Sequence, residues 1–182
     1  MRHKRSVAVL AAAIGLMVVA PAQAAAPPPP TYQKIQFEDV VEAEVAECDR
    51  TLRWDIDGTV RLTTFFDGDG DVRKTVALVT ELNTITDVDN DVTLREGPDV
   101  FTQTTTFNDD GTQIVDIIGL SVLVRDGVNP VIDLGRLKVL IHPDPSQNEV
   151  LIRRGRHDIR GIDPFLLSAD PVHLKGFCPA FV

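Results

Sequence analysis

Side chains that serve as nucleophiles, bases or metal ligands are scarce in this sequence. It holds four histidines and two cysteines in 182 residues. Beyond residue 24, the serines are Ser121, Ser146 and Ser168, and the histidines are His142, His157 and His173. No serine lies in a Gly-x-Ser-x-Gly turn, and no histidines have metal-site spacing. The sequence therefore predicts no catalytic residue, metal or cofactor, although carboxylate pairs stay open because chain spacing does not give separation in space.

Aromatic residues are also few, with one tryptophan, one tyrosine and eight phenylalanines. Large aromatic rings supply much of the contact area of binding surfaces, so a flat aromatic platform for sugars is disfavoured. Trp54 is expected in the core.

Apolar runs long enough to cross a membrane are missing beyond residue 24, because charged residues interrupt each apolar segment.

The N-terminus has the parts of a secretory signal peptide at 1–24. Residues 2–5 are basic, 7–20 are apolar, and the AQA that ends at residue 24 is a small-x-small cleavage site. An uncleaved anchor is the alternative. An Ala/Pro-rich spacer at 25–31 favours an extended chain, and 32–182 is long enough for a single β-domain with its own core. We therefore expect a secreted, extracellular protein with no stable membrane insertion after cleavage.

The balance of charge is strongly acidic, with a net charge of −9 at pH 7. Cleavage after residue 24 removes three of the 18 basic residues and none of the 27 acidic ones, which changes the net charge to −12. Nucleic acids and anionic membrane surfaces repel such a protein. The sequence therefore predicts no nucleic-acid partner.

The two cysteines, Cys48 and Cys178, both lie in the exported part of the chain. Disulfides form in the oxidising compartments that exported proteins enter, so a Cys48–Cys178 disulfide is predicted. The alternative is a reactive or metal-binding thiol, which the lack of a nearby second thiol or histidine disfavours.

Runs with the period of two that is typical of strands recur along the chain. They are VVEAEVAEC (which can also be helical), TVRLTTFF, VRKTVALVTEL, DVTLRE, VFTQTTTF, GTQIVDIIGLSVLV, VIDLGRLKVLI and EVLIRRGR. In the third run, Val72, Val76, Leu78 and Leu82 are expected to share one face. Segments rich in Asp, Asn and Gly separate the runs and favour turns.

This order of runs and turns predicts an all-β domain of about eight antiparallel strands. Short connections favour an up-and-down barrel, and a two-sheet sandwich is the alternative. The tail GIDPFLLSADPVHLKGF has room for one helical turn.

Four segments carry a family resemblance: DGTVRLTTFFDGDGDVRK, TTTFNDDGTQIVDIIGL, VIDLGRLKVLI and EVLIRRGRHDI. Together with a cysteine near the C-terminus, they resemble a group of small secreted proteins of actinobacteria. The resemblance covers roughly residues 45–180. It implies a secreted, β-rich domain of uncharacterised function, and it carries no catalytic residue to transfer.

Three aspartates, Asp67, Asp69 and Asp71, alternate in DGDGD like the first ligands of a calcium loop. Such a loop needs a glycine at its sixth position and a glutamate at its twelfth, where this chain has Val72 and Leu78. The segment is therefore predicted to be a hairpin turn. A weak calcium site on the three carboxylates, filled at millimolar calcium, is the alternative.

Positive charge is concentrated in one segment, which holds Arg153, Arg154, Arg156 and Arg160. Guanidinium groups bind phosphate, sulfate or carboxylate through paired hydrogen bonds, so the four are candidate anion-binding residues. The first three are expected at the edge of any ligand site, and on one strand Arg154 and Arg156 share a face. The alternative is that the arginines only balance nearby acids.

Three kinds of function remain. The favoured one is a non-enzymatic secreted domain that binds a small apolar or anionic ligand. A small hydrolase or isomerase, with a site of Asp, Glu, Arg and His in a barrel mouth, is the second, and a structural or surface-interaction protein is the third. An apolar cavity would support binding, whereas convergent His, Arg and carboxylate groups in one pocket would support an enzyme.

Overall fold

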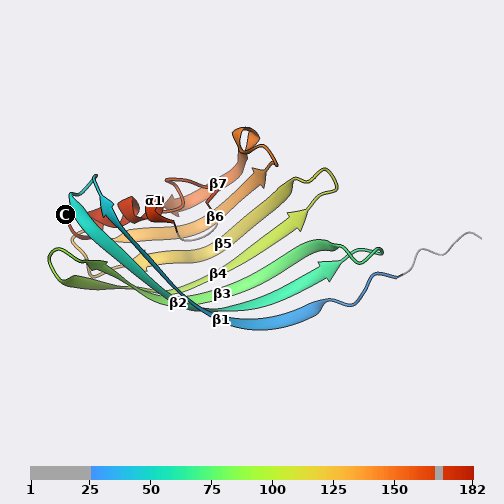
Figure 1. The fold of residues 1–182 in the computed structure, drawn as a ribbon, viewed down its shortest axis with the longest axis horizontal. Helices are drawn as coiled ribbons and strands as arrows, with labels where there is room; N and C mark the ends of the chain where they lie inside the picture. The colour runs from blue at the N-terminus through green and yellow to red at the C-terminus, as the bar shows by residue number, and fades with distance from the viewer. Residues whose placement is uncertain (1–25, 167–169) are drawn as a thin grey trace, which may run out of the picture.

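The fold is a single seven-stranded antiparallel sheet whose strands are paired in chain order (Figure 1). The computed structural model describes residues 26–166 and 170–182. The predicted signal peptide at 1–24 therefore lies outside the described residues. The strands are β1 Thr31–Val45, β2 Arg50–Phe66, β3 Val72–Asp87, β4 Val92–Phe107, β5 Gln113–Val124, β6 Val131–Ile141 and β7 Glu149–His157. Three short helical segments, η1 Pro145–Gln147, α1 Pro171–Leu174 and η2 Lys175–Ala180, complete the described chain.

Alternation along the strands gives the sheet an inner and an outer face. In β2, Leu52, Trp54 and Ile56 are buried while the residues between them are less so. We call this side the inner face; Val79 of β3 lies on it, because it pairs directly with Val60 of β2. Strands of 11–17 residues in β1 to β6 twist and curve together, and the sheet forms a trough in Figure 1.

The C-terminal segment packs on the inner face at one end of this trough. Helix α1 contacts β1 and β2, and η2 contacts β6. Cys178 of η2 forms a disulfide with Cys48 in the turn between β1 and β2, with their Cα atoms 5.6 Å apart. The predicted disulfide is therefore present, and the helical turn expected in the tail is α1.

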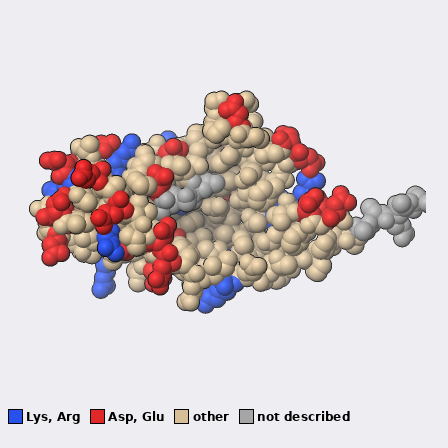
Figure 2. All heavy atoms as spheres, in the orientation of Figure 1, with Lys and Arg blue, Asp and Glu red and all other residues tan. Residues whose placement is uncertain are grey.

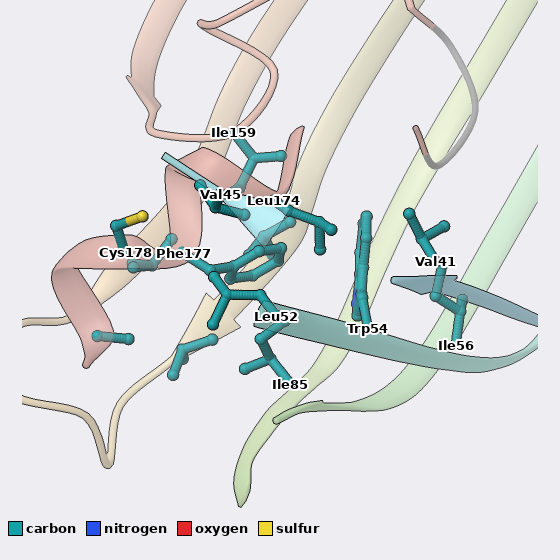
Figure 3. Packing of buried hydrophobic residues seen from close by; sticks show 14 residues of the cluster. Val41, Val45, Leu52, Trp54, Ile56, Ile85, Ile159, Leu174, Phe177 and Cys178 are labelled. Carbon is teal, nitrogen blue, oxygen red and sulfur yellow. The ribbon is translucent and has the colours of Figure 1, made fainter. Parts of the chain in front are cut away.

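Two apolar clusters fill the inner face. The larger lies beneath α1 and η2, where Phe177 packs against Trp54 with ring centroids 5.1 Å apart and Leu52 and Ile85 lie below (Figure 3). Trp54 is thus a core residue, as expected. The smaller cluster lies farther along the trough and is made of Val79, Phe101, Val115, Ile117, Leu137 and Val139. The gap between the clusters is where the cavity described below opens.

The predicted barrel of about eight strands is not confirmed, because the described chain forms one open sheet of seven. The runs DVTLRE and VFTQTTTF belong to one strand, β4, which continues through Gly97 and Pro98. The sheet does not close, since β1 and β7 are its two edges and the C-terminal segment occupies the inner face between β1–β2 and β6. The sandwich alternative is not confirmed either, because the described strands form one sheet.

Candidate functional site

A cavity of about 330 Å³ opens on the inner face between the two apolar clusters. Its apolar walls come from β1 to β5 and include Phe37, Trp54, Ile56, Val60, Val79 and Phe101. Polar side chains also reach it, among them Glu81, Ser121, Arg160 and His173. Acidic residues gather toward both ends of the molecule in Figure 2, whereas the surface between them is mostly uncharged. The cavity therefore combines apolar walls with a few polar groups, as small-molecule sites do.

Glu81 is placed by a row of residues that pair across four strands. Phe37 of β1 pairs with Gly58 of β2, Gly58 with Glu81 of β3, and Glu81 with Asp99 of β4. Glycine is needed in this row, because a Cβ at position 58 would lie 2.5 Å from Phe37 Cζ and 2.9 Å from Glu81 Cγ. The missing side chain brings the Phe37 ring and the Glu81 side chain together over the backbone of β2.

Irregularities in β3 and β4 turn further polar groups inward. The pairing of β3 with β4 shifts between Glu81 and Asn83, and Glu96 and Asp99, three residues apart on β4, are both fully buried. A regular strand would place residues three apart on opposite faces, and bulges are known to re-aim side chains in this way. The result is a group of carboxyls behind the cavity wall.

The Glu96 carboxyl is held by two neighbours. Trp54 Nε1 donates a hydrogen bond of 2.7 Å to Glu96 Oε2. Burial raises the pKa of Glu96 well above its ordinary value, and the neighbouring Asp99 carboxyl raises it further. Burial also raises the pKa of Asp99, although the neighbouring Glu96 carboxyl acts in the opposite direction. Protonation of one carboxyl would relieve the repulsion between two buried carboxylates, which is the direction of both shifts.

Two carboxyls line the cavity itself, that of the half-buried Glu81 and that of the exposed Asp39. Burial raises the pKa of Glu81 to about 7, and the nearby charge of Glu96 adds to this. A hydrogen bond of 3.3 Å from Asn83 Nδ2 and the charge of Arg160 act the other way. Glu81 therefore changes charge near neutral pH, where an ordinary glutamate is fully ionised.

Arg160 supplies the positive charge of the cavity. Its backbone N–H and that of Ile159 donate to the two oxygens of the buried Asp133 carboxylate, at 2.8 and 2.9 Å. Its Nε donates to Ser121 Oγ at 3.3 Å, and its Cζ lies 5.3 Å from the centroid of the Phe101 ring. Among the described residues, no acceptor forms a hydrogen bond with its two Nη groups. These donors are therefore open to a ligand.

His173 is the histidine of this site. It is 2 % exposed on α1, and its Nε2 lies 3.5 Å from the carbonyl oxygen of Asp163. Burial lowers its pKa below the ordinary value of 6.5, so the ring is neutral at pH 7. The arrangement thus offers a neutral imidazole, a guanidinium and a carboxyl of pKa about 7 around one cavity.

Of the four arginines predicted to bind anions, only Arg160 lines the cavity. Arg153, Arg154 and Arg156 are exposed on the edge strand β7. Arg153 donates to the carbonyl oxygen of Gly161, and Arg156 pairs with Asp158 at 2.7 Å. Arg156 thus contacts an acid of its own protein, whereas Arg153 contacts a backbone carbonyl; the prediction that these residues bind an anion stays a prediction.

The three aspartates of DGDGD lie in the turn between β2 and β3. Asp67 Oδ1 accepts hydrogen bonds from the backbone N–H groups of Asp69 and Asp71, at 3.0 and 2.9 Å, and its Oδ2 pairs with Arg73 Nε at 2.9 Å. Both oxygens of Asp67 are therefore engaged by the turn. The described chain contains no cluster of three or more His, Cys, Asp or Glu side chains arranged to hold a metal ion.

Sequence reasoning missed Glu81, Glu96, Asp99 and Asp133 as site residues. One signal was available for two of them, since Glu81 follows the buried Val79 by two positions and Asp133 follows the buried Val131 likewise. An acid with the same period as buried apolar residues points inward. Glu96 and Asp99 gave no such signal, because the irregular pairing of β4 changes the period between them.

No protein-family model, curated protein or solved structure matches this chain. None of the helices in the described ranges has the length and hydropathy needed to span a bilayer. The function therefore has to be inferred from the cavity itself.

Proposed function

We propose that the cavity on the inner face binds a small, largely apolar molecule that carries one oxygen acceptor. The observation that carries this proposal is a cavity of about 330 Å³ with apolar walls and Arg160 at its polar side. Small-molecule pockets begin at about this volume and typically combine apolar walls with a few placed polar groups. The disulfide supports a role outside the reducing cytoplasm.

The polar side favours a neutral ligand over an anion. Among the described residues, Arg160 is the only basic side chain on the cavity wall other than the neutral His173. Glu81, Glu96, Asp99 and Asp133 all interact with its charge. An added anion meets this excess of carboxyls, whereas a carbonyl or hydroxyl oxygen accepts from the Arg160 Nη groups without adding charge.

Binding is tested with the neutral fluorophore N-phenyl-1-naphthylamine, read through energy transfer from Trp54, the one tryptophan of the chain. Val60 lines the cavity, so Val60→Phe should weaken binding at least about tenfold by filling part of the space. Val100 lies on the outer face and is 49 % exposed, so the matched change Val100→Phe should leave binding unchanged. Absence of saturable binding, or equal loss in both variants, refutes the proposal.

The role of Arg160 is tested by competition between two ligands with the same carbon skeleton. 2-Tetralone, a fused two-ring ketone, should displace the fluorophore about tenfold better than tetralin, which lacks the carbonyl. A hydrogen bond from a charged donor contributes about 1.5–3 kcal/mol where water is partly excluded. Equal displacement by the two ligands would mean that Arg160 does not hold an oxygen of the ligand.

A further inference from the structure

We infer that Glu81 takes a proton from carbon in a ketone bound in the cavity, so that the protein catalyses a proton-transfer isomerisation. This inference rests on the proposed binding function and adds a reaction to it. Its basis is the placement of three features around one cavity: a carboxyl, a guanidinium with open donors, and apolar walls.

The carboxyl is suited to act as a base at neutral pH. A general base works best when its pKa lies near the operating pH, and burial brings the pKa of Glu81 to about 7. The charged groups that set this value are Glu96 and Arg160. Asp99, directly across from Glu81 on β4, senses its charge in turn. The row that contains Gly58 holds the Glu81 side chain beside the Phe37 ring, so its surroundings are partly apolar.

The guanidinium is suited to stabilise the charge that forms. When a proton leaves the carbon next to a carbonyl, the C–H electron pair forms a carbon–carbon double bond and the carbonyl π pair moves to oxygen. The enolate oxygen then accepts hydrogen bonds from the Arg160 Nη groups, which have no acceptor among the described residues. Donors already in place around a developing oxyanion are an effective source of rate enhancement.

The proton then returns from Glu81 to carbon. Return to the original carbon, after the Glu81 carboxyl has exchanged its proton with solvent, gives hydrogen–deuterium exchange. Return to the far end of an adjoining double bond gives the conjugated isomer. The reaction needs no oxidant, reductant or second substrate, because Glu81 gives back one proton for each proton that it takes. Asp133 acts as a positioning residue in this scheme, since it accepts one hydrogen bond from the backbone N–H of Arg160 and one from that of Ile159.

Hydrogen–deuterium exchange of 2-tetralone tests the inference with the full, disulfide-bonded chain. Proton NMR in D2O follows loss of the signal at the carbon between the carbonyl and the aromatic ring. Wild-type protein should accelerate this loss about 10²-fold over an equal concentration of the Glu81→Gln protein. The acceleration should rise with pH and level off above about pH 7, because only ionised Glu81 accepts a proton.

Glu149→Gln is the matched control, because Glu149 is exposed at the start of β7. It should exchange as fast as wild type. Fluorophore competition shows in parallel whether each protein binds 2-tetralone. If the wild-type protein binds 2-tetralone without accelerating its exchange, the inference is refuted. Accelerated exchange that persists in Glu81→Gln also refutes it. In both cases the proposed binding function is retained. If the cavity binds neither the fluorophore nor 2-tetralone, the proposed function is refuted, and the inference is refuted with it.

Discussion

Replacing Glu81 with glutamine should make the protein more stable at alkaline pH and leave it almost unchanged at acid pH. The pKa of Glu81 is raised from 4.5 to about 7 in the folded protein, first by burial and then by Glu96. The folded state therefore binds a proton more tightly than the unfolded state does. Stability is lost as pH rises from about 4.5 to about 7, the interval in which the unfolded chain has released this proton and the folded protein retains it.

The size of the gain in stability follows from the shift in the pKa of Glu81. About 2.5 pKa units correspond to about 3 kcal/mol, because each unit is equivalent to about 1.4 kcal/mol. Glutamine keeps the shape and cannot ionise, so Glu81→Gln should gain up to about 3 kcal/mol at pH 8 and almost nothing at pH 4.5. Its amide oxygen can still accept from Asn83, which donates to Glu81 in the wild type.

Urea unfolding followed by Trp54 fluorescence measures the difference at the two pH values. Trp54 is a suitable reporter because it is buried in the larger apolar cluster. Glu149→Gln, which removes an exposed carboxylate on β7, controls for the change in net charge and should show no such pH-dependent gain. A Glu81→Gln protein with the same change in stability at both pH values would refute the assignment of a raised pKa to Glu81.

Two further predictions concern the elements that hold the site. Replacing Cys48 and Cys178 with serine removes a link between residues 130 apart; this should cost about 4–5 kcal/mol, and reductant should destabilise the wild type but not the double variant. Asp133→Ala leaves the backbone N–H groups of Ile159 and Arg160 without their acceptor, which should cost about 2–4 kcal/mol in urea unfolding. Asp133→Asn should cost less, and an alanine variant as stable as wild type would contradict the role of this carboxylate.

Features that depend on neighbouring residues could be predicted from the sequence. The alternation in TVRLTTFF indicated a strand, which is part of β2, and DGDGD indicated a turn, where Gly70 adopts a φ of 91°. The Cys48–Cys178 pairing followed from there being two cysteines in a chain that was expected to be secreted. Each of these features is determined by a few adjacent residues or by composition, so it can be predicted without knowing the tertiary structure.

The inner face of β3 could not be predicted from apolar residues alone. The sequence groups Val72 and Leu78 with Leu82, yet Leu82 is 62 % exposed and Val79 is buried. Both faces of this strand carry apolar residues, so the pattern does not state which one faces the core. Pairing with β2 decides it, because Val79 lies opposite Val60 on the inner face.

The open shape of the sheet also depends on distant residues. A barrel needs its first and last strands to pair, and here α1 and η2 fill the inner face beside β1, β2 and β6 instead. The four-residue length of α1 gives no amphipathic pattern from which such packing could be inferred. The cavity was missed for the same reason, since its polar groups come from three separate parts of the chain: Glu81, Ser121 and Arg160.

Keeping carboxyls in a protein interior is costly. Each buried ionisable group loses hydration that internal partners replace only in part. Beside these carboxyls, the Trp54–Phe177 contact and the disulfide hold the C-terminal segment on the sheet through apolar packing and a covalent link. Trp54 belongs to both regions, because its ring packs in the larger cluster while its Nε1 donates to Glu96. The larger apolar cluster can therefore fix the orientation of the polar groups around the cavity, which is what a site that binds and polarises a small molecule requires.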